Sequence, residues 1–314
     1  MNETNTYRGM FDVSKKGDTL RSATAQAIIK VNPASILLIR NERTPKGDIV
    51  ETAKISAALG AKKTWELIPY CHPIPIDHIF TQLLLHQSSI EIKVNVTSVW
   101  KTGVEMEALT GCSIAALTVY DMLKPIDENL SIESIKLLKK TGGKGEFIEN
   151  FDRKVNVAIL VISDSTFNGK RVDKSGKLIS DTLKTIYATN TEIVGYEILP
   201  DNIDKIKSYL IKYTDEKKVD LIISTGGTGF SKTDVTPDAT KMVVDRETTG
   251  ISEAIRSHGQ RRTPLSMLSR GISGIRNQTL IVNLPGSTKA VAESLDVLLP
   301  SIFHVINILG GKGH

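Results

Sequence analysis

The chain has 314 residues, of which 40% are apolar and 24% are charged, and it carries a formal net charge of +5 at pH 7. This length exceeds the roughly 100–200 residues of a typical domain and predicts two globular units. No run approaches the roughly 18 continuous apolar residues of a membrane span, and residues 1–20 lack the apolar stretch of a secretory signal. We therefore expect a cytoplasmic protein without a membrane partner.

The cysteine count and the distribution of charge exclude further classes of protein. Cys71 and Cys112 are the two cysteines of the sequence, too few for a disulfide framework or a cysteine-based zinc site, and we interpret both as core residues. Lysine and arginine are spread along the chain, without a basic tail, a zinc finger or an RNA-recognition motif. We expect no binding to nucleic acid, because such a small positive excess also suits small anionic ligands.

The first half of the chain shows the patterns of an antiparallel sheet packed against helices. Residues 89–99 alternate apolar and polar side chains as a half-buried strand does, and residues 24–31 and 132–139 alternate more loosely. Helices are predicted over about 48–63 and 104–123. These elements predict an α+β domain of the ferredoxin-like type, with its helices on one face of the sheet.

The sequence pattern changes near residue 150. Residues 155–163 form a β-branched apolar run that ends at Asp164, typical of a strand buried on both faces. No long flexible linker precedes this run. We predict that residues 1–148 form the first domain and residues 154–314 the second.

Strands and helices alternate in the second half. The apolar runs 219–224 and 279–283 end in the loops TGGTG and LPGST. Helical patterns lie at residues 174–188, 202–214, 236–245 and 289–309. This alternation predicts a three-layer α/β domain with a mainly parallel sheet, whose ligands bind beyond the carboxyl ends of the strands.

In the first half, polar side chains gather in four segments: residues 44–48, 67–73, 101–111 and 120–124. Asp121 and Lys124 are three residues apart and share a face of the predicted helix. From spacing alone, a surface ion pair worth under about 1 kcal/mol is the simpler interpretation. His72 likewise fits a structural histidine. The residues by themselves predict a basic pocket that also carries carboxylates.

Residues 10–147 contain three long segments: KGDIVETAKISAALGAKKTWELIPYCHPIPIDH, KTGVEMEALTGCSIAALTVYDMLK and LLKKTGGKGEF. In order and separation they resemble the cyclic pyranopterin monophosphate synthase family, MoaC, of molybdenum cofactor biosynthesis. The resemblance implies that this half converts a cyclised dihydro-GTP triphosphate into cyclic pyranopterin monophosphate and releases pyrophosphate.

The resemblance also implies roles for single residues. Lys46 and Lys124 would be the catalytic lysines, with Asp121 beside them. Because a free lysine has a pKa of about 10.4, proton transfer near neutrality requires a lowered pKa, which we expect from neighbouring basic groups. The other expected contacts with the substrate are Arg21, Lys62, Lys63, His72, Glu105, Glu107, Lys140 and Lys144.

In the second half, the segment STGGTGFSKTDVTPDAT places glycines directly after a predicted strand. Gly226, Gly227 and Gly229 would let backbone N–H groups converge on an anion, and a helix starting near Thr236 would add its dipole. The spacing is not that of a Walker A loop.

Four aspartates lie near the same predicted strand ends: Asp164, Asp201, Asp234 and Asp238. Carboxylates beside a phosphate site fit Mg²⁺, which takes one or two carboxylates together with substrate phosphates. We interpret Asp238 as a residue of the first helical turn instead.

The segments VISDS, LPDN, STGGTGFSKTDVTPDAT, DRETTGISEAIR and MLSRGISGIRNQTLIVNLPGSTKAV resemble the molybdopterin adenylyltransferase family, MogA/MoaB. This resemblance implies transfer of AMP from ATP to the terminal phosphate of molybdopterin, with Mg²⁺ and without a tightly bound organic cofactor. Asp201 and Asp234 would be catalytic and would hold the Mg²⁺. The expected substrate contacts are Asp164, Thr225, Gly226, Gly227, Thr228, Gly229, Ser269, Arg270, Asn283, Pro285 and Gly286.

Together the two resemblances imply a bifunctional enzyme whose substrates are pterins and nucleotides. The alternative is that the second half binds molybdopterin without adenylylating it. Relatives of the two halves form hexamers and trimers, so we expect a homo-oligomer with threefold symmetry. We also expect transient contact with molybdopterin synthase and with the molybdate insertion protein.

Overall fold

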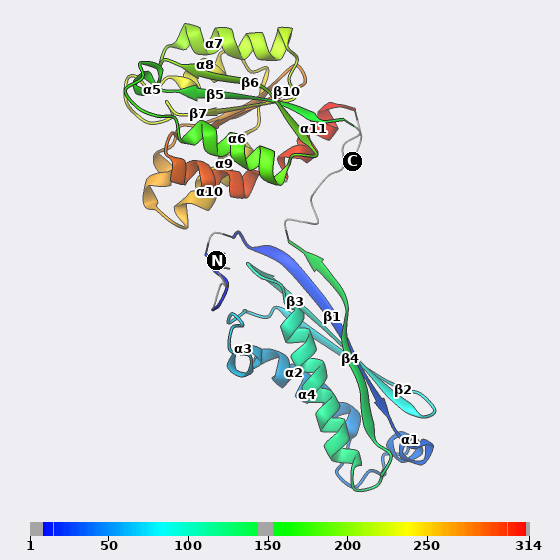
Figure 1. The fold of residues 1–314 in the computed structure, drawn as a ribbon. Helices are drawn as coiled ribbons and strands as arrows, with labels where there is room; N and C mark the ends of the chain where they lie inside the picture. Colours follow the sequence, from blue (N-terminus) through cyan, green and yellow to red (C-terminus); the bar gives the residue numbers. More distant parts are fainter. Residues whose placement is uncertain (1–8, 15, 144–152, 300, 312–314) are drawn as a thin grey trace, which may run out of the picture. The chain divides into compact units, whose positions relative to one another are not determined.

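The computed structural model describes residues 9–14, 16–143, 153–299 and 301–311. It divides into two compact units, Met1–Glu146 and Phe147–His314, which are described separately (Figure 1). The predicted domain end at residue 148 lies outside the described residues, and the limits 1–148 and 154–314 stay predictions.

The first unit is a four-stranded antiparallel sheet in the order β2-β3-β1-β4. Its strands are β1 (Thr19–Lys30), β2 (His78–Leu85), β3 (Ser89–Trp100) and β4 (Ser131–Gly142). Ala23, Ala25, Ala27 and Ile29 are buried in alternation along β1, because successive side chains of a strand point to opposite faces. Strand β2 was not predicted.

Helices cover one face of this sheet (Figure 1). They are α1 (Pro33–Arg40), α2 (Ile49–Lys62), α3 (Thr64–Leu67) and α4 (Glu105–Leu123). Helix α2 begins after Asp48, whose carboxylate accepts from the N–H groups of Val50 and Glu51. The α+β fold and both predicted helices are confirmed, each helix to within about one residue at either end.

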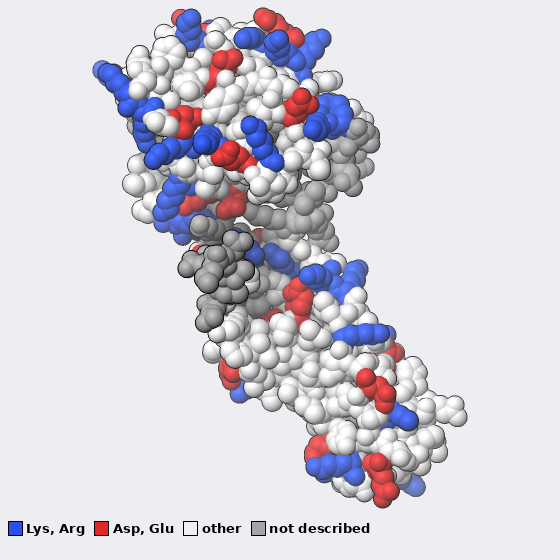
Figure 2. All heavy atoms as spheres, in the orientation of Figure 1, with Lys and Arg blue, Asp and Glu red and all other residues white. Residues whose placement is uncertain are grey.

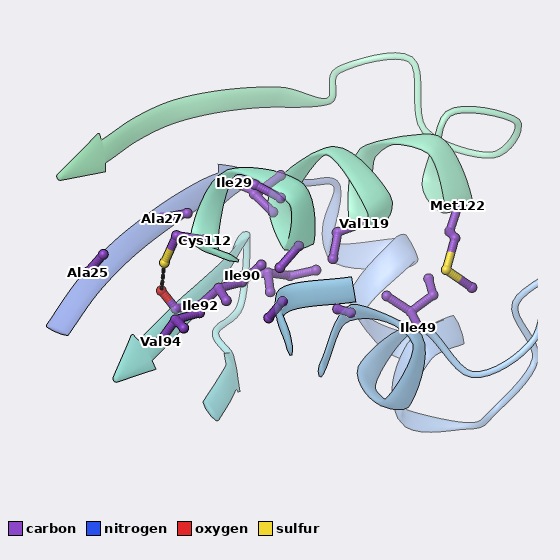
Figure 3. Packing of buried hydrophobic residues seen from close by; sticks show 14 of the residues in the cluster. Ala25, Ala27, Ile29, Ile49, Ile90, Ile92, Val94, Cys112, Val119 and Met122 are labelled. Carbon is purple, nitrogen blue, oxygen red and sulfur yellow. Dashed lines mark hydrogen bonds between the residues drawn. The ribbon is translucent and has the colours of Figure 1, made fainter. Parts of the chain in front are cut away.

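The core of the first unit lies between the sheet and helices α2 and α4. Figure 3 shows Cys112 of α4 between Ala27 of β1 and Ile92 of β3, with its thiol bonded to the main-chain oxygen of Ile92. A Cβ at Gly60 of α2 would lie 2.8 Å from Ile114 of α4, so glycine permits the close approach of these helices. Cys112 is fully buried, as predicted, whereas Cys71 is only partly buried.

The second unit contains a mixed sheet in the order β6-β5-β7-β10-β9-β8. Its strands are β5 (Val155–Ile162), β6 (Thr191–Leu199), β7 (Leu221–Thr225), β8 (Arg246–Glu247), β9 (Ser273–Arg276) and β10 (Thr279–Leu284). The pairs β5–β6, β5–β7 and β7–β10 are parallel, and β9 is antiparallel to β10 and to β8. The predicted, mainly parallel α/β domain is confirmed.

Two apolar clusters cover the two faces of this sheet. Val157, Ile159 and Val161 of β5 belong to one cluster, and Leu160 and Ile162 belong to the other. Helices α6 (Ser175–Ile186), α9 (Thr249–Gln260) and α10 (Thr288–Leu298) lie on one side, and α7 (Ile203–Ile211) and α8 (Thr236–Lys241) on the other (Figure 1). The remaining helical segments are α5 (Asp164–Phe167), the π-helix η2 (Lys212–Glu216), the 3₁₀-helix η3 (Pro264–Leu268) and α11 (Ile302–Leu309).

Two helix predictions need correction. Residues 289–309 do not form one helix, because α10 ends at Leu298 and α11 begins at Ile302. Pro300 lies between them in the sequence, and proline lacks the N–H that a continuous helix needs. The predicted helix 236–245 ends at Lys241.

The surface of each unit carries charges of both signs (Figure 2), as the spread of basic and acidic residues along the sequence predicts. Basic and acidic side chains are interspersed over the visible face of each unit (Figure 2). Within the described ranges, no single helix has both the length and the apolar character to cross a membrane; only the bent pair α10 and α11 meets both conditions jointly.

Candidate active sites

One carboxylate holds two lysines at the C-terminal end of α4. Nζ of Lys46 donates to Oδ2 of Asp121 over 2.7 Å, and Nζ of Lys124 lies 2.8 Å from Oδ1. Lys124 is the residue directly after α4, so it shares the helix face of Asp121. The three residues predicted to be catalytic in the first domain therefore form one cluster.

The charges in this cluster change the pKa values of its members. Hydrogen bonds from Lys124 and Lys46 lower the pKa of Asp121 to about 2. In return, the bond to Asp121 raises the pKa of Lys124. The expectation of a lowered lysine pKa is thus wrong for Lys124, because its ammonium group is bonded to a carboxylate.

A second group of predicted residues lines a cavity of about 490 Å³ at the other end of α4. His72, Glu105 and Glu107 are in its wall, with Cys71. Nε2 of His72 donates to the main-chain oxygen of Phe11 over 2.8 Å. This histidine is therefore held by the segment that precedes β1.

Glu107 is the most buried carboxyl group of this cavity. It is 3% exposed, and its Oε2 has no hydrogen-bond partner within the part of the chain that the structure describes. Burial, together with the charge of Glu105, raises the pKa of Glu107 to about 7. This side chain can therefore exchange a proton near neutral pH.

A neighbouring cavity of about 290 Å³ shares Gly103 and Glu105 with the first and adds Arg21 and Lys140. Nζ of Lys140 lies 3.3 Å from Oε1 of Glu105. Two cations beside a nucleotide-sized space suit a phosphate group. Lys62 and Lys63 line neither cavity, and Lys144 lies outside the described residues.

The two groups of the first unit stand at opposite ends of α4. Asp121 follows Glu105 by 16 positions, which is about 24 Å along a helix that rises 1.5 Å per residue. The structure thus brings the predicted residues together as two clusters.

The second unit carries a cleft of about 200 Å³ at the carboxyl ends of β5 and β7. Six of the predicted residues line it: Asp201, Asp234, Thr225, Gly226, Gly227 and Gly286. This is the edge at which ligands of parallel sheets normally bind.

The turn at Gly226 and Gly227 needs both glycines. Their φ angles are +99° and +60°, and a Cβ would collide with the main-chain oxygen of Ile162 or with Oγ1 of Thr236. The N–H of Gly226 donates to Leu284 O over 3.2 Å. The prediction that this N–H faces an anion is therefore wrong.

The helix after this turn also differs from its predicted role. Helix α8 has only six residues, and the N–H of its first residue, Thr236, donates to Gly227 O over 3.1 Å. Its hydroxyl donates to Gly226 O over 2.9 Å. The start of α8 thus fastens the glycine turn and leaves one fewer N–H for a ligand.

Asp164 and Asp201 form a reciprocal pair of hydrogen bonds, each from a main-chain N–H to the carboxylate of the other residue. The N–H of Asp164 donates to Oδ2 of Asp201 over 2.9 Å, and the N–H of Asp201 donates to Oδ1 of Asp164 over 3.1 Å. Burial raises the pKa of Asp201, and the charges of Asp164 and Asp234 add to this effect. Such crowding of negative charge is relieved by a bound cation.

Arg270 and Asn283, both predicted pterin contacts, form hydrogen bonds within the fold. Nε of Arg270 donates to Gly229 O over 2.8 Å, and its guanidinium binds both carboxylate oxygens of Asp238. Asn283 is 3% exposed, and its amide donates to Ser224 and Thr240. Neither side chain lines the cleft, and their roles as pterin contacts stay predictions. Asp238 lies in the first turn of α8, as predicted.

The other predicted contacts also stand outside the walls of the cleft. They are Asp164, Thr228, Gly229, Ser269 and Pro285. Thr228 is buried and accepts from the N–H of Arg270, and Pro285 accepts from the hydroxyl of Thr225. Their roles as substrate contacts stay predictions.

Comparison with known proteins covers both units. Residues 10–143 match the MoaC family, and residues 158–304 match a probable molybdopterin binding domain. A molybdenum cofactor biosynthesis bifunctional protein of Chlorobaculum tepidum is 37% identical over 305 residues, which are 97% of this chain and 96% of that protein. The chain belongs to this family of bifunctional proteins. Both resemblances drawn from the sequence motifs are thereby confirmed.

A relative of the first half alone agrees with this assignment. A cyclic pyranopterin monophosphate synthase of Peptoclostridium acidaminophilum is 46% identical over 144 residues, 46% of this chain and 91% of that protein. The crystal structure of the molybdopterin biosynthesis enzyme MoaB from Thermus thermophilus is 41% identical, with a TM-score of 0.47, and covers 50% of this chain and 98% of that chain.

Sequence reasoning missed one wall of the cleft in the bifunctional chain. The loop between α5 and α6 contributes four residues to it, Arg171, Val172, Asp173 and Lys174, and Ser175 at the start of α6 adds a fifth. A signal was available, because GKRVDKSGK is rich in basic residues and follows the predicted strand that ends at Asp164. Loops after parallel strands share one edge of the sheet.

Proposed function

We propose that the first domain converts a cyclised dihydro-GTP triphosphate into cyclic pyranopterin monophosphate, and that the second transfers AMP from ATP to molybdopterin. Pyrophosphate leaves in both reactions. The observation that carries the proposal is that each unit holds its own cluster of the expected catalytic residues, Asp121 with two lysines in one and Asp201 with Asp234 in the other.

In the first reaction, Lys46 and Lys124 act as cations for the charged substrate, oriented by Asp121. The raised pKa of Lys124 keeps this lysine protonated near neutrality. Glu107 has a pKa of about 7, so it is the group that accepts and returns protons while the ring system rearranges. Arg21 and Lys140 bind the phosphates at the adjoining cavity.

The separation within the first unit supports a shared site. Glu105 and Asp121 are about 24 Å apart along α4. A single nucleoside triphosphate is too short to bridge this distance. A second copy lying antiparallel along α4 would bring Lys124 of one chain beside Glu107 of the next. Such an antiparallel pair is a twofold contact, which fits a hexamer built from three pairs. The expected homo-oligomer with threefold symmetry, a trimer or a hexamer, stays part of the proposal.

A mixing experiment tests the shared site. Chains carrying Lys124→Ala and chains carrying Glu107→Gln are each expected to be inactive alone. When the two are co-expressed, mixed oligomers contain some sites with both residues intact, so part of the activity should return. No recovery, together with a monomer in light scattering, would count against the proposal.

In the second reaction, Asp201 and Asp234 fit a Mg²⁺ site. Within the ranges it describes, the structure contains no group of three His, Cys, Asp or Glu side chains placed to hold a metal ion by themselves. Mg²⁺ bound to nucleotides takes only one or two carboxylates plus phosphates. When bound, Mg²⁺ would neutralise phosphate charge. The N–H of Asp164 orients Asp201, and the N–H of Ser231 orients Asp234 over 2.8 Å.

Incubation of the full chain with Mg-ATP and molybdopterin tests the second activity. Mass spectrometry should detect the adenylylated pterin and pyrophosphate. A pterin that binds without modification would favour the alternative of a non-catalytic molybdopterin-binding module. Contact with molybdopterin synthase and with the molybdate insertion protein stays part of the proposal and is testable by cross-linking.

A further inference from the structure

The second unit has a basic wall in its cleft to which no role has been given. Arg171 and Lys174 line the cleft together with Asp201 and Asp234. Neither cation forms an ion pair or hydrogen bond through its side chain with any residue that the structure describes. They differ in this from Arg153 and Arg276, each of which binds a carboxylate through two nitrogens.

The carboxylate between these cations in sequence is engaged elsewhere. Oδ2 of Asp173 accepts the hydroxyl of Tyr196, and Oδ1 accepts the N–H of Gly176 over 2.9 Å. Tyr196 comes from β6, and Gly176 from the first turn of α6. Asp173 therefore anchors the loop to two elements of the fold and forms no bond with Arg171 or Lys174.

The contacts among Asp173, Gly176 and Tyr196 are closely packed. A Cβ at Gly176 would lie 2.5 Å from the hydroxyl oxygen of Tyr196 and 2.6 Å from Oδ2 of Asp173. Such distances are impossible for real atoms, so glycine is required where the loop enters α6. Asp173, which lies between Arg171 and Lys174 in the sequence, is thus held by contacts with both β6 and α6.

The cleft is lined by charges of both signs. Asp201 and Asp234 supply negative charge, and the pair Arg171 and Lys174 supplies positive charge with donors free for a ligand. A phosphate group suits such a pair, because charge-assisted hydrogen bonds from arginine and lysine to phosphate are the strongest that side chains make.

We propose that Arg171 and Lys174 bind a phosphate group of a substrate, and that Tyr196 is a positioning residue that acts through Asp173. The proposal rests on the proposed function of this domain for the choice of ligands. The phosphate belongs either to the triphosphate of ATP or to the terminal phosphate of molybdopterin, and separate binding measurements distinguish these sources.

The test measures equilibrium binding to the full chain, with ATP and molybdopterin as separate ligands. The variant Arg171→Ala/Lys174→Ala is compared with Lys170→Ala/Lys177→Ala, which removes two exposed lysines beside the cleft. We expect Kd for at least one ligand to rise about tenfold or more in the first variant only. Unchanged binding of both ligands, or an equal loss in the control, would overturn the proposal. Because binding is measured without turnover, an inactive wild-type chain would contradict the proposed function alone.

The positioning role needs a separate variant. Tyr196→Phe keeps the ring and removes the hydroxyl that binds Asp173, so KM for the affected ligand should rise severalfold at unchanged kcat. Tyr213→Phe is the matched control. The hydroxyl of Tyr213 donates to Oε1 of Glu197 at a distance of 3.0 Å, and neither residue lines the cleft. A general loss of packing would instead lower Tm and change KM for both ligands. Equal KM values for the wild type and Tyr196→Phe would overturn this role.

Discussion

Lys46 binds Asp121 twice, through the main-chain oxygen at 2.9 Å and through Oδ2 at 2.7 Å. This pair joins the loop before α2 to the end of α4, across 75 positions of sequence. Because the other carboxylate oxygen binds Lys124, one aspartate orients both lysines. The cluster therefore makes its three members dependent on one another.

Removal of one lysine tests its part in the first reaction. Lys124→Ala should lower turnover by about a hundredfold or more, the usual scale for losing a positioned catalytic group. Its side chain is 57% exposed, so Tm should change little. Lys54→Ala is the control, because Lys54 forms a similar exposed pair with Glu51 outside the cavities. Product formation at the wild-type rate would remove Lys124 from the site.

The pH dependence of the rate tests the coupling between Asp121 and Lys124. Asp121 raises the pKa of Lys124, so Asp121→Asn should return that pKa towards its ordinary value. The protonated lysine is then lost at lower pH. We expect the alkaline limb of kcat/KM to move to lower pH in this variant, and a limb that stays in place would contradict the coupling.

Glu107 gives a pH dependence of stability with a defined sign. Its folded pKa of about 7 exceeds the ordinary value of 4.5, so the folded chain retains a proton that the unfolded chain releases between these values. Stability contributed by this group is present below pH 4.5 and is lost as pH rises through 7.

Glu107→Gln removes the charge that burial disfavours. It should therefore raise Tm more at pH 8 than at pH 5. Glu51→Gln serves as control, because the side chain of Glu51 is exposed, is paired with Lys54 and lies outside this cavity. An identical change of Tm at the two pH values would show that Glu107 is already ionised at pH 5.

Two glycines offer a matched test of the turn in the second cleft. Gly227→Ala places a Cβ against Thr236 and 2.9 Å from Oδ1 of Asp201, at a φ of +60°. A left-handed residue with a Cβ costs about 1–2 kcal/mol before this collision is counted. Gly250→Ala in α9 meets no atom within 4 Å and should raise stability by up to about 1 kcal/mol. Denaturant titration of both variants checks the contrast.

Features written in a short stretch of sequence could be predicted. The alternation of β3, the N-cap of α2 at Asp48 and the two-sided burial of β5 depend only on neighbouring residues. Pro300 was visible too, although the break between α10 and α11 was not predicted. Strand β2 was missed because three of its eight side chains are exposed at the edge of the sheet.

Features that depend on distant residues could not be read in this way. The bond from Gly226 to Leu284 follows from the register of β7 beside β10. The raised pKa of Lys124 reflects its bond to Asp121, and the spacing of these two residues suggested that pair. The spacing could not show that Lys46, 75 positions away, binds the same carboxylate. Motif resemblance identified Asp201 and Asp234, yet the basic wall at Arg171 and Lys174 appeared only with the cleft.

We propose that one chain carries two kinds of catalytic site that act separately. Mass spectrometry of both products, made by the wild type, Lys124→Ala and Asp201→Asn chains, tests this proposal. We expect the wild type to form cyclic pyranopterin monophosphate and adenylylated molybdopterin, Lys124→Ala to lose only the first, and Asp201→Asn to lose only the second. A wild-type chain that forms one product alone, or a single variant that loses both, would contradict the claim.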